Sequence, residues 1–156
     1  MSQTILEQVH RFLDWAAKKV QIHFSQRGDI YFEECEVWWA SLGENVGAEI
    51  NGKNFHFERP VAILKKFSGE LLFVAPLISS LKNGSWFQPV HIDGRENRAV
   101  LVQVRTISSR RLIRKIGNIS YSEFMLLQER VISLIKTEPP MGFGGSSDPL
   151  ARTICV

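Results

Sequence analysis

Few cysteines occur in this sequence, and none is spaced with histidine in a way suited to zinc. The two cysteines, Cys35 and Cys155, lie far apart among 156 residues. A disulfide framework or a zinc site would need more ligands in closer spacing. We therefore expect free thiols in a reducing cytoplasm, and neither a metal nor another cofactor.

Long hydrophobic runs are also lacking. No apolar stretch approaches the roughly 20 residues that a helix needs to cross a bilayer. The N-terminus starts polar and does not follow the charged-then-apolar order of a signal peptide. These absences predict a cytoplasmic protein without a membrane partner.

Charge of one sign is only mildly in excess. The formal net charge is +3, and 44% hydrophobic against 22% charged residues is ordinary for a globular protein. The length suffices for one domain with a core, and we find no internal repeat. The charge permits an anionic partner, but it does not distinguish nucleic acid, acidic protein and no partner at all.

Two capping boxes mark the beginnings of helices. Thr4-x-x-Glu7 precedes apolar residues at helical spacing, which predicts an amphipathic helix over residues 4–22 with Lys18 on its solvent side. Ser120-x-x-Glu123 opens a second helix that continues to about residue 135.

Short apolar segments between turn signals predict strands. Ser68-Gly69, Asn83-Gly84 and Asp93-Gly94 are such turns. The predicted strands cover residues 36–40, 60–66, 71–76, 86–91 and 98–103, and residues 108–116 are interpreted as a short basic helix. This order predicts an α+β fold: a small, strongly bent antiparallel sheet or barrel with an N-terminal helix and C-terminal helices.

The chain is expected to have three parts. Residues 1–27 form a helical extension packed on the domain, and residues 28–137 form the domain itself. Residues 138–156 are rich in proline, glycine and serine, which predicts a flexible tail.

Four segments occur in an order that indicates a family. Residues 36–49 read Glu-Val-Trp-Trp-Ala-Ser-Leu-Gly-Glu-Asn-Val-Gly-Ala-Glu, and Arg59-Pro60-Val61 begins the next strand. Val74-Ala-Pro-Leu-Ile-Ser79 follows, and Gln103-Val-Arg-Thr-Ile107 precedes Arg111-Leu112. In this order they resemble the MazF/PemK family, the ribonuclease toxins of bacterial toxin–antitoxin pairs.

The resemblance implies a fold and an activity. The fold is an SH3-like partial barrel of the MazF/CcdB type with a C-terminal helix. The activity is metal-independent endoribonuclease cleavage of single-stranded RNA. A homodimer and a cognate antitoxin, typically with a disordered acidic segment, are implied as partners.

Arg59, His56 and Ser79 are the predicted catalytic residues. Arg59 corresponds to the family's loop arginine, and its planar fork suits the scissile phosphate; the alternative is an ion pair that fixes the loop. His56 is a candidate proton carrier, with an exposed, uninvolved imidazole as the alternative. Ser79 lies beside the family's Thr-Ser pair, whose threonine position is Ile78 here.

Four residues are predicted to bind the substrate. Ser80 is a second hydroxyl that could replace the missing threonine, and Glu49 matches a family acidic position that could orient the catalytic arginine. Gln103 could hydrogen-bond a base or the phosphate, and Arg105 could bind phosphate or stabilise the fold.

Two valines leave alternatives open. Val100 and Val102 occupy positions at which some PemK relatives have an acid and an arginine, and neither can transfer a proton. A catalytically inactive RNA- or protein-binding module is therefore one alternative. A CcdB-like gyrase poison on the same scaffold is another.

A basic run without acidic residues follows the last strand. Placed beside a strand end, it could follow an RNA backbone. Phe55 and Phe57 are predicted to be exposed and could stack on unpaired bases. The run consists of Arg105, Arg110, Arg111, Arg114 and Lys115.

Overall fold

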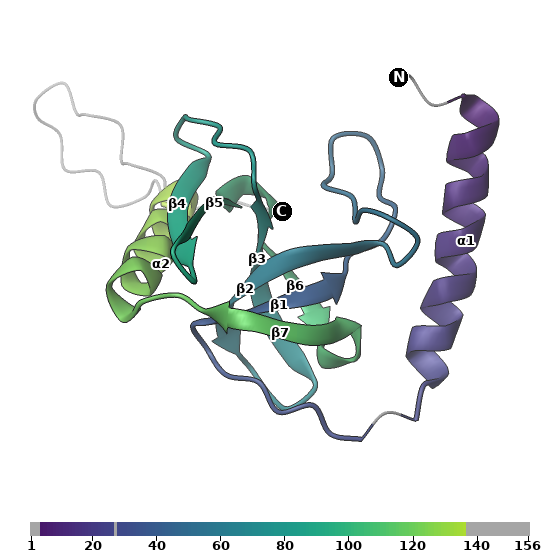
Figure 1. Ribbon diagram of the computed structural model, residues 1–156, viewed down its shortest axis with the longest axis horizontal. Coiled ribbons are helices and arrows are strands. Elements are labelled where there is room, and N and C mark those ends of the chain that lie inside the picture. The colour runs from purple at the N-terminus through teal and green to yellow at the C-terminus, as the bar shows by residue number, and fades with distance from the viewer. Residues whose placement is uncertain (1–3, 27, 137–156) are drawn as a thin grey trace, which may run out of the picture.

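The computed structural model describes residues 4–26 and 28–136 (Figure 1). The predicted tail, residues 138–156, lies outside the described residues, as does Cys155. Helices α1 (Ile5–Phe24) and α2 (Tyr121–Ile135) flank the sheet. The strands are β1 (Glu36–Ser41), β2 (Glu58–Lys66), β3 (Leu71–Ile78), β4 (Phe87–Ile92), β5 (Arg95–Val100), β6 (Arg105–Ser108) and β7 (Leu112–Asn118), and the 3₁₀ turns are η1 (Leu101–Gln103) and η2 (Ser109–Arg111).

The strands form one antiparallel sheet that stays open. Its order is β4-β5-β3-β2-β1-β7, and β6 pairs with β3. The sheet bends at β3, because the first half of β3 pairs with β6 while Leu77 and Ile78 pair with β5. Each face of the bent sheet covers its own apolar core. The predicted α+β fold with a small, bent antiparallel sheet is confirmed.

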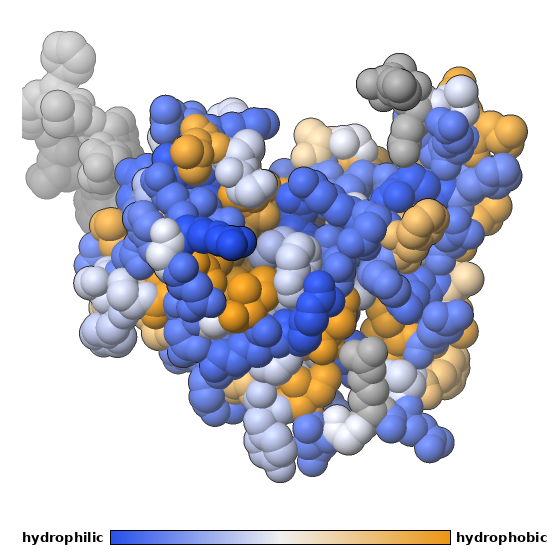
Figure 2. Space-filling view, in the orientation of Figure 1, coloured by the Kyte–Doolittle hydropathy of each residue, from blue (hydrophilic) through white to orange (hydrophobic). Residues whose placement is uncertain are grey.

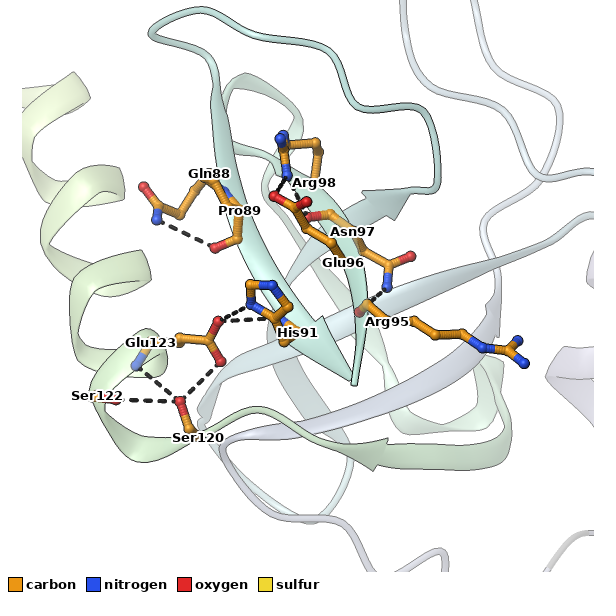
Figure 3. A network of polar contacts seen from close by, with 10 residues as sticks. All are labelled: Gln88, Pro89, His91, Arg95, Glu96, Asn97, Arg98, Ser120, Ser122 and Glu123. Atoms are coloured by element: carbon orange, nitrogen blue, oxygen red, sulfur yellow. Dashed lines mark hydrogen bonds and ion pairs between the residues drawn. The ribbon is translucent and has the colours of Figure 1, made fainter. Parts of the chain in front are cut away.

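The two apolar cores lie on opposite faces of the sheet. One core lies between the sheet and α2 and includes Leu77, Leu101 and Leu127. The other lies on the opposite face and includes Phe32 and Leu112. Figure 3 shows an exposed polar contact between the sheet and α2, where His91 Nδ1 of β4 lies 2.7 Å from the Glu123 carboxylate of α2. Burial of apolar area on both faces is the main stabilising contribution.

The predicted basic helix over residues 108–116 is wrong. Residues 109–111 form η2, and residues 112–118 form β7, which pairs with β1. Leu112 is fully buried in the second core, whereas Arg114 and Lys115 are exposed. Pairing with β1 gives the main-chain groups on that side of β1 hydrogen-bond partners, and this long-range gain overrides local helix propensity.

The predicted strand over residues 98–103 is partly wrong. The strand begins earlier, at Arg95, and it ends at Val100, after which residues 101–103 form η1. This turn lets the chain leave β5 and return beside β3 as β6, a strand for which the sequence analysis made no separate prediction. The other four predicted strands are confirmed within two residues at each end.

Both predicted capping boxes begin helices, the first with both reciprocal hydrogen bonds and the second with only one of them. The Thr4 hydroxyl accepts a hydrogen bond from Glu7 N at 3.3 Å, and the Glu7 carboxylate accepts one from Thr4 N at 2.8 Å. Ser120 Oγ likewise accepts from Glu123 N at 3.3 Å. These bonds satisfy main-chain donors that a helix leaves free in its first turn.

Helix α1 is oriented with its apolar side outward. It contacts the domain through Trp15, which is 5% exposed, and through Arg11, whose guanidinium lies over the Phe57 ring. Lys18, predicted on the solvent side, is half-buried on this inner side. Ile5 and Leu13 remain 82% and 62% exposed. Figure 2 shows apolar side chains along the outer edge of α1.

Gly43 allows α1 to approach the domain closely. Its φ is +95°, and a Cβ atom built there would lie 2.2 Å from Trp15 Cε2. A substitution therefore combines backbone strain with an overlap against a buried ring. We expect Gly43→Ala to lower the free energy of unfolding by at least about 2 kcal/mol, measured by urea denaturation.

Gly69→Ala is the matched control. A Cβ at Gly69 would meet nothing within 4 Å, so we expect a change within about 0.5 kcal/mol. Equal stability of the two variants would contradict the close contact between Trp15 and Gly43.

Candidate functional site

Arg59 lies at the beginning of β2, opposite Ala40 of β1. Its side chain is half-buried, and Nε donates a hydrogen bond to the Asn51 carbonyl at 2.7 Å. Burial lowers the pKa of Arg59 from its ordinary value, but an arginine stays charged at any working pH. Among residues 4–26 and 28–136, no carboxylate forms an ion pair with Arg59. The Arg59 guanidinium is therefore held by a neutral carbonyl, and its positive charge remains available to an anion.

Glu49 and Glu58 are the two acidic residues that could form the alternative ion pair with Arg59, and both have other contacts. Glu58 Oε2 accepts from Arg114 Nη1 at 2.9 Å, and Glu58 Oε1 from Arg114 Nη2 at 3.3 Å. Glu49 instead accepts from Val46 N at 3.3 Å. The alternative that Arg59 serves to fix the loop through an ion pair is thus not what the structure shows.

The Glu58–Arg114 pair stabilises the end of the sheet. The Glu58 side chain is 7% exposed, and Arg114 lies over the Trp39 ring at 5.0 Å from its centroid. Hydrogen bonds from Arg114 hold the pKa of Glu58 below its usual range, although burial alone would raise it. A bidentate pair of this kind is both strong and directional.

A polar frame fixes the loop that binds Arg59. Asn51 Oδ1 accepts from Asn45 N, and Asn51 Nδ2 donates to Glu44 Oε1, both at 2.7 Å. Glu44 in turn forms an ion pair with Arg11 of α1 at 2.7 Å. The carbonyl that holds Arg59 is therefore connected to the N-terminal helix through three side chains.

Gln103 also forms hydrogen bonds with the main chain of this loop. Its Oε1 accepts from Ile50 N, and its Nε2 donates to the Ala48 carbonyl, both at 3.1 Å. Both ends of the amide are thereby used within the protein. The geometry accordingly gives Gln103 a positioning contact with the loop.

Ser79 and Ser80 lie just beyond the end of β3, and both are exposed. The β2–β3 register pairs Val61 with Pro76. Continuing that register by two residues places Ile78 opposite Arg59. Ser79 and Arg59 thus belong to the same end of the sheet.

His56 is exposed in the loop before β2, and it lines cavities beneath α1 together with Lys18. Arg59 lines neither of these two cavities. The structure therefore brings His56 to the N-terminal helix, whereas it brings Ser79 to the strand end of Arg59.

Glu49 and Arg105 line one cavity of about 540 Å³ between α1 and the sheet. Arg111 lines it as well, and burial followed by the neighbouring Arg105 charge lowers the pKa of Arg111. Two predicted substrate-binding residues thus meet at a cavity lined by both acidic and basic side chains. It includes Arg111, for which no individual role was predicted.

The prediction that Phe55 and Phe57 form an exposed pair is half wrong. Phe55 is 94% exposed. Phe57 is 4% exposed, and its ring centroid lies 5.4 Å from that of Trp15. Contact with α1, which no local pattern encodes, buries this aromatic side chain.

Comparisons with known proteins agree with this fold. The PemK-like, MazF-like toxins of type II toxin–antitoxin systems match residues 33–135 of the sequence. The chain belongs to this family. No protein in a search of curated sequences matches it significantly.

Solved structures support the fold. MazF (Form-I) from Deinococcus radiodurans is 18% identical with a TM-score of 0.57, over 68% of this chain and 97% of that chain. MazE-MazF (Form-II) from the same organism gives 14% identity and a TM-score of 0.53, over 70% and 100%. Helix α1 precedes the segment that matches the family.

Two other kinds of feature are absent from the described residues. No helix there is long and apolar enough to cross a membrane. Nor do three or more His, Cys, Asp or Glu side chains gather there in a way that could hold a metal ion. Cys35, one of the two thiols of the chain, is half-buried, and burial raises its pKa.

The pKa of Glu58 predicts an acid-sensitive contribution to stability. A carboxylate whose pKa is lower in the folded than in the unfolded state stabilises the fold above the unfolded value, here about 4.5. That contribution is lost as pH falls through the folded pKa. We expect Glu58→Gln to lower the free energy of unfolding by about 1–3 kcal/mol at pH 7.

Urea denaturation of wild type and variant at pH 7 and pH 3.5 measures this effect. The difference between the two proteins should shrink at the lower pH. Glu129→Gln, which changes an exposed carboxylate on α2, is the control and should have little effect. A Glu58→Gln effect that is independent of pH would contradict the ion pair.

Proposed function

We propose that this protein is the toxin of a type II toxin–antitoxin pair and cleaves single-stranded RNA without a metal. The observation that supports this activity most directly is the charge of Arg59. It stands at a strand end of a MazF-like sheet with a main-chain carbonyl, not a carboxylate, as its hydrogen-bond partner. A fixed cation of this kind stabilises charge that develops on a phosphoryl group.

The proposed reaction is transfer within one nucleotide. The ribose 2′-oxygen attacks the adjacent phosphorus, the bond from phosphorus to the 5′-oxygen breaks, and the products carry a 2′,3′-cyclic phosphate and a 5′-hydroxyl. Arg59 binds the non-bridging oxygens. A general base takes the 2′ proton, and a general acid returns a proton to the 5′-oxygen.

Ser79 and His56 are the candidates for proton movement. Ser79 is supported by the β2–β3 register, which, continued from the Val61–Pro76 pair, brings this residue to the same end of the sheet as Arg59. Histidine is the side chain most often used for proton transfer near neutral pH, but His56 lines cavities beneath α1. Glu49, Ser80 and Arg105 would then contact the flanking RNA, and Gln103 would act by holding the loop.

The partners follow from the family. One of the similar solved structures, from Deinococcus radiodurans, is named MazE-MazF. This name supports a cognate antitoxin for this chain. We further propose a homodimer that acts in the cytoplasm. Residues 28–137 would be the toxin domain, with residues 1–27 as an extension and residues 138–156 as a tail.

The second candidate function is a binding module without catalysis. It is favoured by Ile78, Val100 and Val102, none of which can transfer a proton. Val100 is also 7% exposed, so it presents little surface to a substrate. A gyrase poison is the third and less favoured candidate. CcdB toxins rely on apolar C-terminal residues, which residues 150–156 resemble only faintly, and these lie outside the described residues.

Removing the Arg59 charge tests the proposed activity. Purified wild type should cleave mixed RNA in EDTA. Arg59→Ala should lower the single-turnover rate by about two to three decades, as loss of an oxyanion donor does elsewhere. Arg95→Ala, which removes an exposed arginine at the beginning of β5, is the charge-matched control and should cleave at the wild-type rate.

Other outcomes separate the three candidate functions. Intact RNA at high protein concentration, with salt-dependent binding, would indicate the binding module. Inhibition of gyrase supercoiling with intact RNA would indicate the gyrase poison. Equal loss of rate in both arginine variants would show that charge alone, and not the position of Arg59, matters.

A further inference from the structure

A basic pocket lies between α1 and η2, outside the site around Arg59. This α1–η2 pocket has a volume of about 380 Å³, and Lys18, His56, Arg110 and Arg111 line it. None of its lining residues is acidic. A smaller neighbouring cavity shares both arginines and adds Lys19 and His23. Figure 1 shows α1 standing beside the end of the sheet where β7 begins.

The arginines of this pocket are held by neutral groups. Arg111 Nη1 donates to the Ser41 carbonyl at 3.0 Å, and its guanidinium lies over the Trp15 ring. Arg110 Nη1 donates to the His23 carbonyl at 2.7 Å, at the C-terminal end of α1. These contacts fix the cations in place but do not cancel their charge.

The cationic side chains of the pocket lack acidic partners within the described chain. Lys18, Arg110 and Arg111 form no ion pair among residues 4–26 and 28–136. Cations of like sign that are gathered around one cavity repel each other, and Arg111 is half-buried as well. An anion with several acceptor oxygens would relieve this repulsion.

An exposed aromatic ring stands next to the pocket. A further cavity of about 430 Å³ shares Lys18 and His56 with it and is also lined by Phe55 and Asp14. Phe55 is 94% exposed. Its ring therefore has a face open to a ligand whose charged part occupies the pocket.

The turn that carries Phe55 is fixed. Asn54 and Phe57 on either side of it have φ of 54° and 52°. Asn54 Oδ1 accepts from His56 N at 2.9 Å, and Asn54 Nδ2 donates to Glu58 at 3.1 Å. Phe57 is buried against Trp15. The exposed ring is thus presented by an ordered backbone, which reduces the entropy lost on binding.

We propose that the α1–η2 pocket binds a backbone phosphate of single-stranded RNA while Phe55 stacks on an adjacent base. A cationic site beside an exposed aromatic ring is the combination that binds single strands. An acidic peptide would use the cations but not the ring. The ligand class rests on the proposed function, but the contacts themselves involve the N-terminal extension.

Binding of an uncleavable strand tests the proposal. A fluorescent 2′-O-methyl oligoribonucleotide lacks the nucleophile of the proposed reaction, so anisotropy reports affinity alone. Phe55→Ala should weaken binding about five- to hundred-fold. Lys18→Ala should reduce the slope of log affinity against log salt by about 0.7, the value for one phosphate contact on a single strand.

Two surface variants are matched controls. Phe67→Ala removes an aromatic that is 58% exposed in the β2–β3 turn, and Lys136→Ala removes an exposed lysine after α2. Neither should change affinity or salt slope. Binding of all four variants equal to wild type would overturn the proposal.

Competing anions distinguish the sources of the negative charge. Inorganic phosphate and polyglutamate are titrated against the labelled strand. If Lys18→Ala weakens polyglutamate as much as RNA, and Phe55→Ala weakens neither, the pocket is an acidic-protein site and the proposal fails. The proposal also fails if inorganic phosphate binds at the pocket but Lys18→Ala has the same affinity for RNA as wild type.

The test is separate from that of the cleavage activity. RNA that stays intact while the two pocket variants still lose affinity overturns only the proposed cleavage. Cleavage with a normal Arg59 dependence, but without any loss of affinity in Lys18→Ala and Phe55→Ala, overturns only the pocket.

Discussion

The Asn51 carbonyl is the contact on which the position of the Arg59 charge depends. It lies in a loop that is held by the hydrogen bonds of Asn51 with Asn45 and Glu44 and by those of Gln103. Glu44 is held by Arg11, so α1 contributes to the order of a loop more than thirty residues away. A charged side chain that is held in advance loses less entropy when it meets an anion.

The same helix gives the protein a second basic surface. Its inner side carries Lys18 and Trp15 toward η2, while apolar residues such as Ile5 and Leu13 face outward. Ring packing and charge contacts, and not the apolar stripe, therefore determine which side of α1 faces the domain. Such an arrangement is unusual for an amphipathic helix, whose apolar side normally covers a core.

The bent sheet determines which polar groups can act together. Because β3 pairs with β2, β5 and β6, its end brings Ile78 opposite Arg98 of β5. Figure 3 shows Arg98 in contact with the Glu96 carboxylate. Arg98 is 7% exposed, and its Nε donates to the Lys82 carbonyl at 3.1 Å, which holds the segment that follows Ser79 and Ser80. Polar groups at this end of β3 thus support the backbone.

The sequence alone determined both helices and most strands, because caps, turn residues and apolar spacing act within a few residues of one another. It also indicated the family. Only the tertiary structure decided that residues 112–118 extend the sheet, that Glu58 pairs with Arg114, and that Phe57 is buried beneath α1. Those outcomes depend on contacts between distant segments, whose energies exceed local preference and leave no local pattern.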